Sequence, residues 1–315
     1  MNIIITGSSG FIGFHLAKYL IKKNKVLGLD NHNSYYSKSI KQKRLSILKR
    51  KKNFFFKKIN LIKKAKLEKI FKDFKPDIVF HIAGQPGVLY SLKNPKSYTI
   101  NNVHVTKNIC RVAKKFTIKK FIYASSSSVY GDQKKFPIKE KFKTNPKNPY
   151  AKTKLISEKI VTKSFTKHKT QFIIFRFFTV YGPYGRPDMF IHKLLNAIKQ
   201  NRKIKLHNNG LNLRDFTYID DVIKILNLTL NKNLNGNIYN ICRSSPIITN
   251  ELISLISKIY KKKIKVLQKT GFIKGEMYKT HGSNKEIKKY IGFKKFTNIK
   301  KGIQETIKIF KKINI

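Results

Sequence analysis

The sequence predicts an α/β fold, a doubly wound parallel sheet with a smaller C-terminal α/β lobe. Two observations support this prediction. Over the first 180 residues, short apolar runs of strand length alternate with helical stretches, an order that is typical of parallel sheets covered by helices. After residue 180 this alternation loosens. We therefore expect a first domain over residues 1–180 and a second lobe over 181–315, with some segments of the lobe returning to the first domain.

Each expected strand is a short apolar run between polar or turn-forming residues. In the first domain we expect strands at 2–6, 25–30, 53–57, 78–81, 120–125 and 172–178, and helices at 14–22, 38–50, 66–73, 97–116 and 149–166. In the second lobe we expect helices near 189–200, 220–230, 249–260 and 298–312, and strands near 203–206, 237–241 and 263–267.

The first two strands enclose a glycine pattern that is typical of dinucleotide binding. Gly7 allows a tight turn, Gly10 allows a pyrophosphate to approach the backbone, and Gly13 allows helix and strand to pack closely. The following helix presents unpaired N–H groups and the positive end of its dipole to the phosphates. The second strand ends at Asp30, whose carboxylate accepts hydrogen bonds from a ribose 2′-OH and repels a 2′-phosphate. The pattern predicts a Rossmann domain that binds NAD in preference to NADP.

The composition is that of a globular chain. Hydrophobic residues make up 41% of the sequence, and no stretch approaches the roughly 18 apolar residues of a membrane span. The first strand begins at residue 2, so we expect no signal peptide. Cys110 and Cys242 stand in apolar contexts without the spacing of a metal site. These features predict a cytoplasmic protein with buried thiols, no metal and no membrane partner.

The formal net charge of +54 has two explanations. Nucleic-acid binding is one, but the basic residues are spread along the whole chain and only eight of the 69 are arginine. Lysine, asparagine, isoleucine and phenylalanine all have A/T-rich codons, so we favour codon drift that placed lysines on solvated faces. Arg44 and Arg50 are then expected to be exposed arginines that drift has not replaced. The positive field should still attract anionic sugar nucleotides.

A tyrosine and a lysine four residues apart predict a catalytic pair. Tyr150 and Lys154 share one face of the helix expected at 149–166, where an ammonium would lower the pKa of the tyrosine and suit it to act as a base. The strand expected at 120–125 runs into four serines, Ser125 to Ser128, where ligands bind in doubly wound folds. Together these residues predict a Ser-Tyr-Lys triad.

The glycine loop, the serine run and the Tyr150/Lys154 pair resemble the extended short-chain dehydrogenase/reductase superfamily, in its branch of sugar-nucleotide epimerases and dehydratases. Segments 29–36, 81–88, 176–189 and 214–221 further resemble the UDP-glucuronate 4-epimerases, and Arg186-Pro187-Asp188 is the most discriminating stretch. The resemblance covers nearly the whole chain. It implies an enzyme with NAD as its cofactor, a UDP-sugar as its substrate and a homodimeric assembly.

The resemblance also implies a role for individual residues. Ser126, Tyr150 and Lys154 match the catalytic positions, with Ser127 as a one-residue alternative to Ser126. The positions implied to bind the cofactor are Gly7, Gly10, Phe11, Ile12, Gly13, Asp30, Asn31, Asn60, Ala83, Asn102, Ser125, Tyr150 and Lys154. The positions implied to bind the substrate are Ser127, Thr179, Arg186, Arg214 and Glu276. Among these, Arg214 matches an arginine that binds the UDP diphosphate, and Arg186 matches one that is placed for the sugar carboxylate.

The implied reaction is epimerisation at C4, converting UDP-glucuronate to UDP-galacturonate for surface polysaccharide synthesis. UDP-glucose or UDP-N-acetylglucosamine is the alternative substrate. Arg186 argues against both, since a neutral sugar would leave the charge of this arginine without a partner. A sugar-nucleotide 4,6-dehydratase would need an added acid and base where Ser127-Ser128 stand. A non-catalytic protein that binds nucleotides or nucleic acid is supported by the charge alone, and the intact Tyr150/Lys154 pair argues against it.

Overall fold

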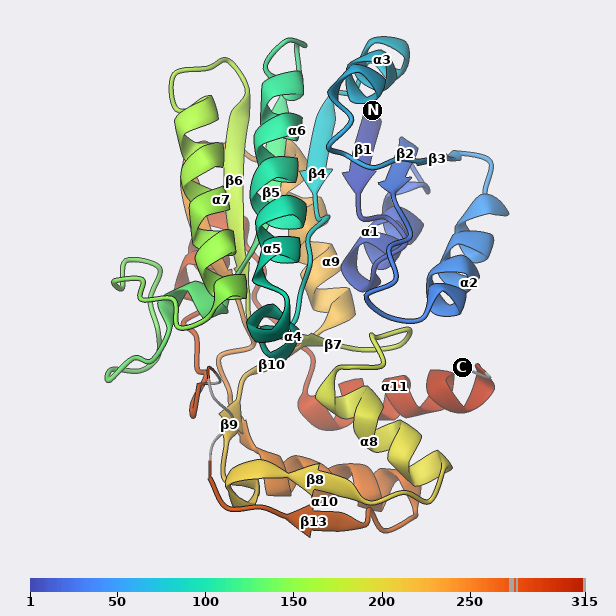
Figure 1. Cartoon of the computed structure of the whole chain (residues 1–315), viewed down its shortest axis with the longest axis vertical. Helices are drawn as coiled ribbons and strands as arrows, with labels where there is room; N and C mark the ends of the chain where they lie inside the picture. Colours follow the sequence, from blue (N-terminus) through green and yellow to red (C-terminus); the bar gives the residue numbers. More distant parts are fainter. Residues whose placement is uncertain (272–274, 276, 314–315) are drawn as a thin grey trace.

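The computed structural model describes residues 1–271, 275 and 277–313, and its centre is a seven-stranded parallel sheet. The strand order is β11-β6-β5-β4-β1-β2-β3 (Figure 1). The strands are β1 (Asn2–Thr6), β2 (Lys25–Asp30), β3 (Phe54–Lys58), β4 (Ile78–His81), β5 (Lys120–Ser126), β6 (Gln171–Phe177) and β11 (Asn237–Ile241). The predicted fold class is confirmed, and six of these strands lie within one residue of the ranges expected in the first domain.

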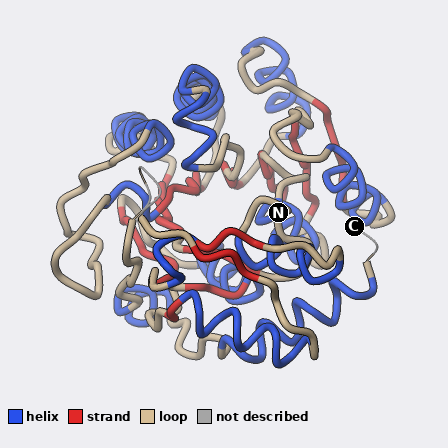
Figure 2. Tube along the Cα trace, turned by 60° about the horizontal axis from the view of Figure 1, so that its bottom comes forward, coloured by secondary structure: helices blue, strands red, loops and turns tan. Residues whose placement is uncertain are grey.

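The strands are apolar on both faces because helices cover both. Along β1, Ile3 and Ile5 enter one hydrophobic core, while Ile4 enters the other. The first core contains α1 (Phe11–Leu20), α2 (Lys38–Lys49) and α9 (Ile219–Leu228). The second contains α3 (Lys64–Phe74), α6 (Val105–Ala113) and α7 (Pro149–Phe165). Figure 2 shows helices (blue) on either side of the strands (red).

The C-terminal elements form a second group at the carboxyl ends of the parallel strands. In Figure 1, β1, β2 and β4 point toward this group. Its helices are α8 (Phe190–Lys199), α10 (Thr249–Tyr260) and α11 (Ile299–Lys312). Its short strand pairs are β8 (Ile204–Leu206) with β13 (Val266–Gln268), β9 (Leu213–Arg214) with β12 (Ile247–Ile248), and β7 (Thr179–Tyr181) with β10 (Phe216–Tyr218). In contrast, β11 and α9 lie with the central sheet, β11 as its edge strand beside β6.

Two predicted helices differ from those observed. The helix expected at 14–22 begins at Phe11, because Gly10 is its N-cap in an extended conformation, so Gly13 lies in its first turn. The helix expected at 97–116 is three consecutive pieces, α5 (Pro95–Tyr98), a π-helical segment (Thr99–His104) and α6. The short helix α4 (Val88–Lys93) and strands β7, β9, β10 and β12 were not predicted, because elements of two to six residues are too short to show a period.

Within the described part of the chain, no helix is both long and apolar enough to cross a membrane.

Candidate active site

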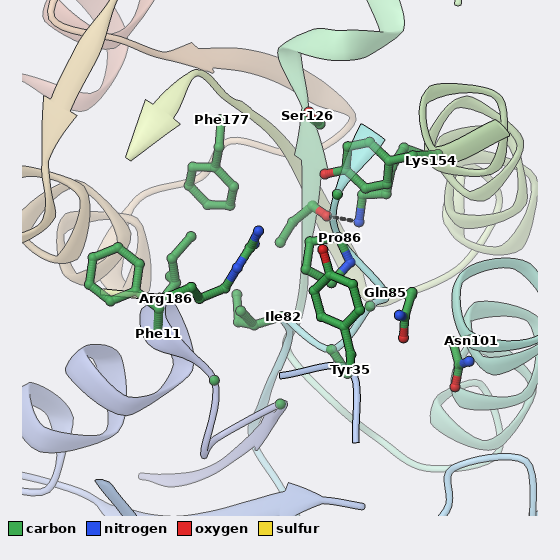
Figure 3. A pocket seen from close by; sticks show the side chains of 18 of the residues that line it. Phe11, Tyr35, Ile82, Gln85, Pro86, Asn101, Ser126, Lys154, Phe177 and Arg186 are labelled. Carbon is green, nitrogen blue, oxygen red and sulfur yellow. Dashed lines mark hydrogen bonds between the residues drawn. The ribbon is translucent and has the colours of Figure 1, made fainter. Parts of the chain in front are cut away.

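One cavity of about 460 Å³ lies at the carboxyl ends of the parallel strands. Its wall includes the glycine loop, the end of β2, the serine run after β5, the start of α7 and the loop before α8. Figure 3 shows Arg186 reaching into it from the side opposite Lys154. The position agrees with the rule that doubly wound sheets bind ligands beyond the carboxyl ends of their strands.

The glycine loop is shaped for a phosphate group. Gly7 has a φ of +69°, which residues with a side chain rarely adopt. A Cβ at Gly10 would lie 2.9 Å from the carbonyl oxygen of Gly7, and one at Gly13 would lie 2.2 Å from the same atom. Glycine is therefore required at all three positions, and the loop leaves the backbone of α1's first turn open to the cavity. This geometry fits the pyrophosphate of a dinucleotide.

Asp30 lies at the end of β2, beside the glycine loop. Its carboxylate accepts hydrogen bonds from the backbone N–H of Ser9 at 3.1 Å and of His32 at 2.8 Å. These bonds fix the carboxylate beside the glycine loop and leave lone pairs for ribose hydroxyls. The residues therefore fit NAD.

Most of the other residues expected to bind the cofactor line the cavity, and one does not. Phe11, Ile12, Asn31, Asn60, Ala83 and Ser125 line the cavity. Among the described residues that we expected in the site, Asn102 alone does not line it. The Asn102 side chain is buried, accepts a hydrogen bond from the N–H of Gln85 at 2.6 Å and donates one to the Thr153 hydroxyl at 3.0 Å. It joins the loop after β4 to α7, and the neighbouring Asn101 lines the cavity instead.

The start of α7 places the proposed catalytic pair. Asn148 caps the helix by accepting a hydrogen bond from the N–H of Ala151 at 2.9 Å, and Pro149 takes the first helical position. Tyr150 and Lys154 then line the cavity one turn apart, together with Ser126. The Lys154 amine donates to the carbonyl of Ala124, the bond drawn as a dashed line in Figure 3, and lies 4.5 Å from the centre of the Tyr123 ring.

The electrostatics of this pair differ from our expectation. Burial raises the pKa of Tyr150, and a hydrogen bond with Ser126 and the charge of Arg186 only partly oppose the rise. The expected lowering of the tyrosine pKa by Lys154 is wrong for this geometry, because desolvation dominates and the lysine amine is directed to Ala124. Burial also lowers the pKa of Lys154 to about 7, and the negative charge of Glu158 opposes that fall.

Glu158 is a buried residue behind the site that the sequence reasoning missed, since it contacts Ser125 but does not line the cavity. It lies one turn beyond Lys154 on α7 and accepts a hydrogen bond from the Ser125 hydroxyl. Its carboxylate also accepts from Nε of Arg176 at 3.0 Å and from Nη2 at 2.7 Å, in a pair that is almost fully buried. Arg176 on β6 stands directly opposite Ser125 on β5. The spacing from Lys154 to Glu158 is again four residues, which was the signal available in the sequence.

Arg186 already has a carboxylate partner within the protein. Its Nε and Nη2 donate to the two oxygens of Asp188 at 3.0 and 2.7 Å, and the Tyr35 hydroxyl donates to the same carboxylate at 3.2 Å. The Asp188 charge raises the pKa of Arg186, while burial raises the pKa of Tyr35 to about 12. Our argument that a neutral sugar would leave Arg186 unpaired is therefore wrong.

The other described residues expected to bind the substrate lie on the same cavity. Ser127, Thr179 and Arg214 line it, and Arg214 donates through Nη1 to the carbonyls of Leu213 at 3.0 Å and Tyr278 at 2.8 Å. Glu276 lies outside the described residues.

Arg44 corrects another expectation. Arg50 is exposed as predicted, but Arg44 is fully buried, with five hydrogen bonds to the glycine loop, Tyr36 and the chain before Arg186. A sequence without an alignment does not distinguish a buried arginine from an exposed one. In the described part of the chain, no group of three or more His, Cys, Asp or Glu residues is arranged to hold a metal ion.

Comparison with known proteins places this site in a family. The family model described as "NAD dependent epimerase/dehydratase family" matches residues 3–242. The chain is 35% identical over 310 residues to the UDP-glucuronate 4-epimerase of Thermodesulfobacterium geofontis, covering 96% of this chain and 94% of the relative.

Two solved structures are close in fold. The structure of UDP-glucuronic acid 4-epimerase from Bacillus cereus in complex with UDP-glucuronic acid and NAD has a TM-score of 0.94 and 30% identity, and the match covers 99% of each chain. The structure of UDP-glucose 4-epimerase from Thermotoga maritima with UDP-glucose has a TM-score of 0.91 and 25% identity, again over 99% of each chain. This protein is therefore an enzyme that uses NAD, and it belongs to the NAD dependent epimerase/dehydratase family.

Proposed function

We propose that the protein interconverts the C4 epimers of a UDP-sugar and that this sugar is UDP-glucuronate. The reaction class rests on family membership and on the ligand-bound relatives described above. The choice of sugar rests on one observation, the free edge of the Arg186 guanidinium.

A guanidinium has two edges that can each bind a carboxylate through two N–H groups. Asp188 occupies the edge formed by Nε and Nη2. Within the described part of the chain, Nη1 makes no hydrogen bond, and Arg186 lines the cavity. The second edge, formed by Nη1 and the other hydrogen of Nη2, therefore suits the C6 carboxylate of a uronic acid.

The chain supplies acid–base chemistry and positioning. We propose that Tyr150 takes the proton from the 4-hydroxyl and later returns it, with Ser126 as its hydrogen-bond partner. When bound, NAD supplies the acceptor and donor of the C4 hydride. Lys154, on the same face of α7, supplies a positive charge beside the base. Arg214 holds the diphosphate, which keeps the 4-keto sugar in the site while it turns over, and Arg186 binds the C6 carboxylate.

UDP-glucose or UDP-N-acetylglucosamine remains the second candidate for a specific reason. Because Asp188 neutralises Arg186, a neutral sugar can enter the cavity without isolating a buried charge. Specificity for glucuronate must then come from the two N–H groups on the free edge of the Arg186 guanidinium, since the net charge of the Arg186–Asp188 pair is zero.

The test is direct. Purified protein is incubated with UDP-glucuronate, UDP-glucose and UDP-N-acetylglucosamine in separate reactions, and each is assayed for its 4-epimer. We expect the highest kcat/KM with UDP-glucuronate. A higher value with either neutral sugar would overturn the substrate assignment, and the absence of any 4-epimer would overturn the reaction class.

A further inference from the structure

Arg44 is a buried cation that the proposed chemistry does not use. It lies on α2, its side chain is 0% exposed, and no described carboxylate forms an ion pair with it. Burial lowers the pKa of its guanidinium, yet arginine stays protonated in proteins. Burying such a charge is costly unless hydrogen bonds compensate it. The atoms that compensate it therefore indicate what Arg44 does.

Those atoms belong to three separate loops. Nη1 donates to the carbonyl of Ser9, in the glycine loop, at 3.0 Å. Nε and Nη2 donate to the carbonyl of Tyr184 at 3.2 and 2.6 Å, and Nη2 also donates to the carbonyl of Gly185 at 3.2 Å. Nη1 further donates to the Tyr36 hydroxyl at 2.7 Å. One planar group therefore fixes the glycine loop to the two residues that directly precede Arg186.

The segment that Arg44 holds has an unusual backbone. Tyr184 has a φ of +56°, a left-handed conformation that carries strain for a residue with a side chain. After it, Arg186 accepts a hydrogen bond from the N–H of Met189 at 3.1 Å in a turn that leads into α8. The direction of the Arg186 side chain depends on this turn, and Arg44 supplies the anchor at its start.

We propose that Arg44 is a positioning residue for sugar recognition: it anchors the chain before Arg186 to the glycine loop, so that the free edge of the Arg186 guanidinium faces the sugar. The sugar named here rests on the proposed function, but the anchoring does not. A lysine could not substitute, because a tetrahedral ammonium lacks the flat set of donors that reaches three carbonyls and a hydroxyl.

The first experiment measures binding. The Kd values of UDP-glucuronate and UDP-glucose are measured calorimetrically, at saturating NAD, for the wild type, Arg44→Lys, Arg186→Ala and the double variant. Arg50→Lys, an exposed change next to the C-terminal end of α2, is the matched control. We expect Arg44→Lys to weaken the binding of UDP-glucuronate about tenfold and that of UDP-glucose less than about threefold. The effect should be smaller than that of removing a charge that contacts the sugar directly, because Arg44 acts through Arg186.

The double variant separates positioning from a general defect. If Arg44 acts through Arg186, adding Arg44→Lys to Arg186→Ala should change the Kd of UDP-glucuronate by less than about threefold. Additive losses of affinity in the double variant would overturn the proposal, and so would equal losses of affinity for UDP-glucuronate and UDP-glucose. Should Arg44→Lys fail to fold, Tyr36→Phe removes the 2.7 Å acceptor alone. This substitution should weaken the binding of UDP-glucuronate about threefold and that of UDP-glucose less. Equal effects on the two Kd values would again overturn the proposal.

The second experiment does not depend on the substrate. Amide hydrogen exchange of residues 184–189 is compared between the wild type and Arg44→Lys without any UDP-sugar, with α10 as the internal reference. Faster exchange confined to 184–189 is the expected result, and unchanged exchange would overturn the anchoring role. Faster exchange in a protein whose wild type does not epimerise UDP-glucuronate would sustain the anchoring and reject only the proposed substrate.

Discussion

The carboxylate of Asp188 holds the guanidinium of Arg186 by one edge, with Nε–Oδ1 and Nη2–Oδ2 distances of 3.0 and 2.7 Å. The pair is formed by residues two apart in the loop before α8, so it fixes the arginine without help from a ligand. It cancels the local charge and leaves the opposite edge of the guanidinium for the cavity. If Arg186 selects the substrate as we propose, the selection depends on geometry more than on net charge.

The first prediction concerns the base. Tyr150→Phe keeps the ring and removes the ionisable hydroxyl, so turnover of the preferred UDP-sugar should fall by roughly 10²–10⁴-fold. The ring remains to pack against Tyr98, whose centroid lies 6.1 Å away, so the melting temperature should change little. Steady-state kinetics and thermal unfolding check both statements. Near-normal turnover would exclude Tyr150 as the base.

The second prediction concerns the choice of cofactor. Asp30→Ala removes the carboxylate that we expect to bind the ribose and also frees the N–H groups of Ser9 and His32. We expect about tenfold weaker NAD binding and a reduced preference for NAD over NADP, because the repulsion of the 2′-phosphate is lost. Fluorescence titration of both dinucleotides measures this. Equal affinities of the wild type for NAD and NADP would contradict the role of Asp30.

Most of the fold could be predicted from the sequence, because long amphipathic helices and short apolar strands leave a clear period. The order β1 to β6 and the glycine loop follow from such local patterns. The Glu158–Arg176 pair could not be predicted, since it joins α7 to β6 and depends on how β5 and β6 align. The same holds for Arg44, whose backbone partners Ser9, Tyr184 and Gly185 lie 35 to 141 residues away in the sequence.

For the proposed catalytic pair, the sequence predicted that Tyr150 and Lys154 share one face of a helix, but it did not predict their electrostatics. Burial raises the pKa of Tyr150 and lowers the pKa of Lys154, and neither effect can be read from a four-residue spacing. Both depend on how completely the surrounding chain excludes water.

The third prediction concerns pH. Four titratable groups surround Lys154: Tyr150, Glu158, Tyr123 and His81. Burial lowers the pKa of His81 to about 3, which keeps it neutral, and raises the pKa of Tyr123, so Glu158 is the negative charge that sustains the Lys154 ammonium. Glu158→Gln removes that charge, so the pKa of Lys154 should fall from about 7 to a lower value. The ammonium would then be lost at lower pH, and the alkaline limb of the kcat profile should move toward acid.

The matched control for this experiment is Glu140→Gln. Glu140 also has its carboxyl group near Arg176, but that group accepts from the N–H of Asn240 and is not among the groups that shift the pKa of Lys154. The alkaline limb should stay in place in this control. Movement in both variants, or in neither, would show that Glu158 does not set the charge of Lys154.

The most direct test of the substrate assignment is the effect of Arg186→Ala on two substrates. Removing the guanidinium leaves the sugar carboxylate desolvated without a partner, which costs about 2–5 kcal/mol in comparable charge pairs. The value of kcat/KM for UDP-glucuronate should therefore fall at least about 30-fold, and Arg186→Lys should recover only part of it. Any activity on UDP-glucose should fall much less, because that sugar has no carboxylate. Equal losses on UDP-glucuronate and UDP-glucose would contradict carboxylate recognition by Arg186 and, with it, the assignment of UDP-glucuronate as the substrate.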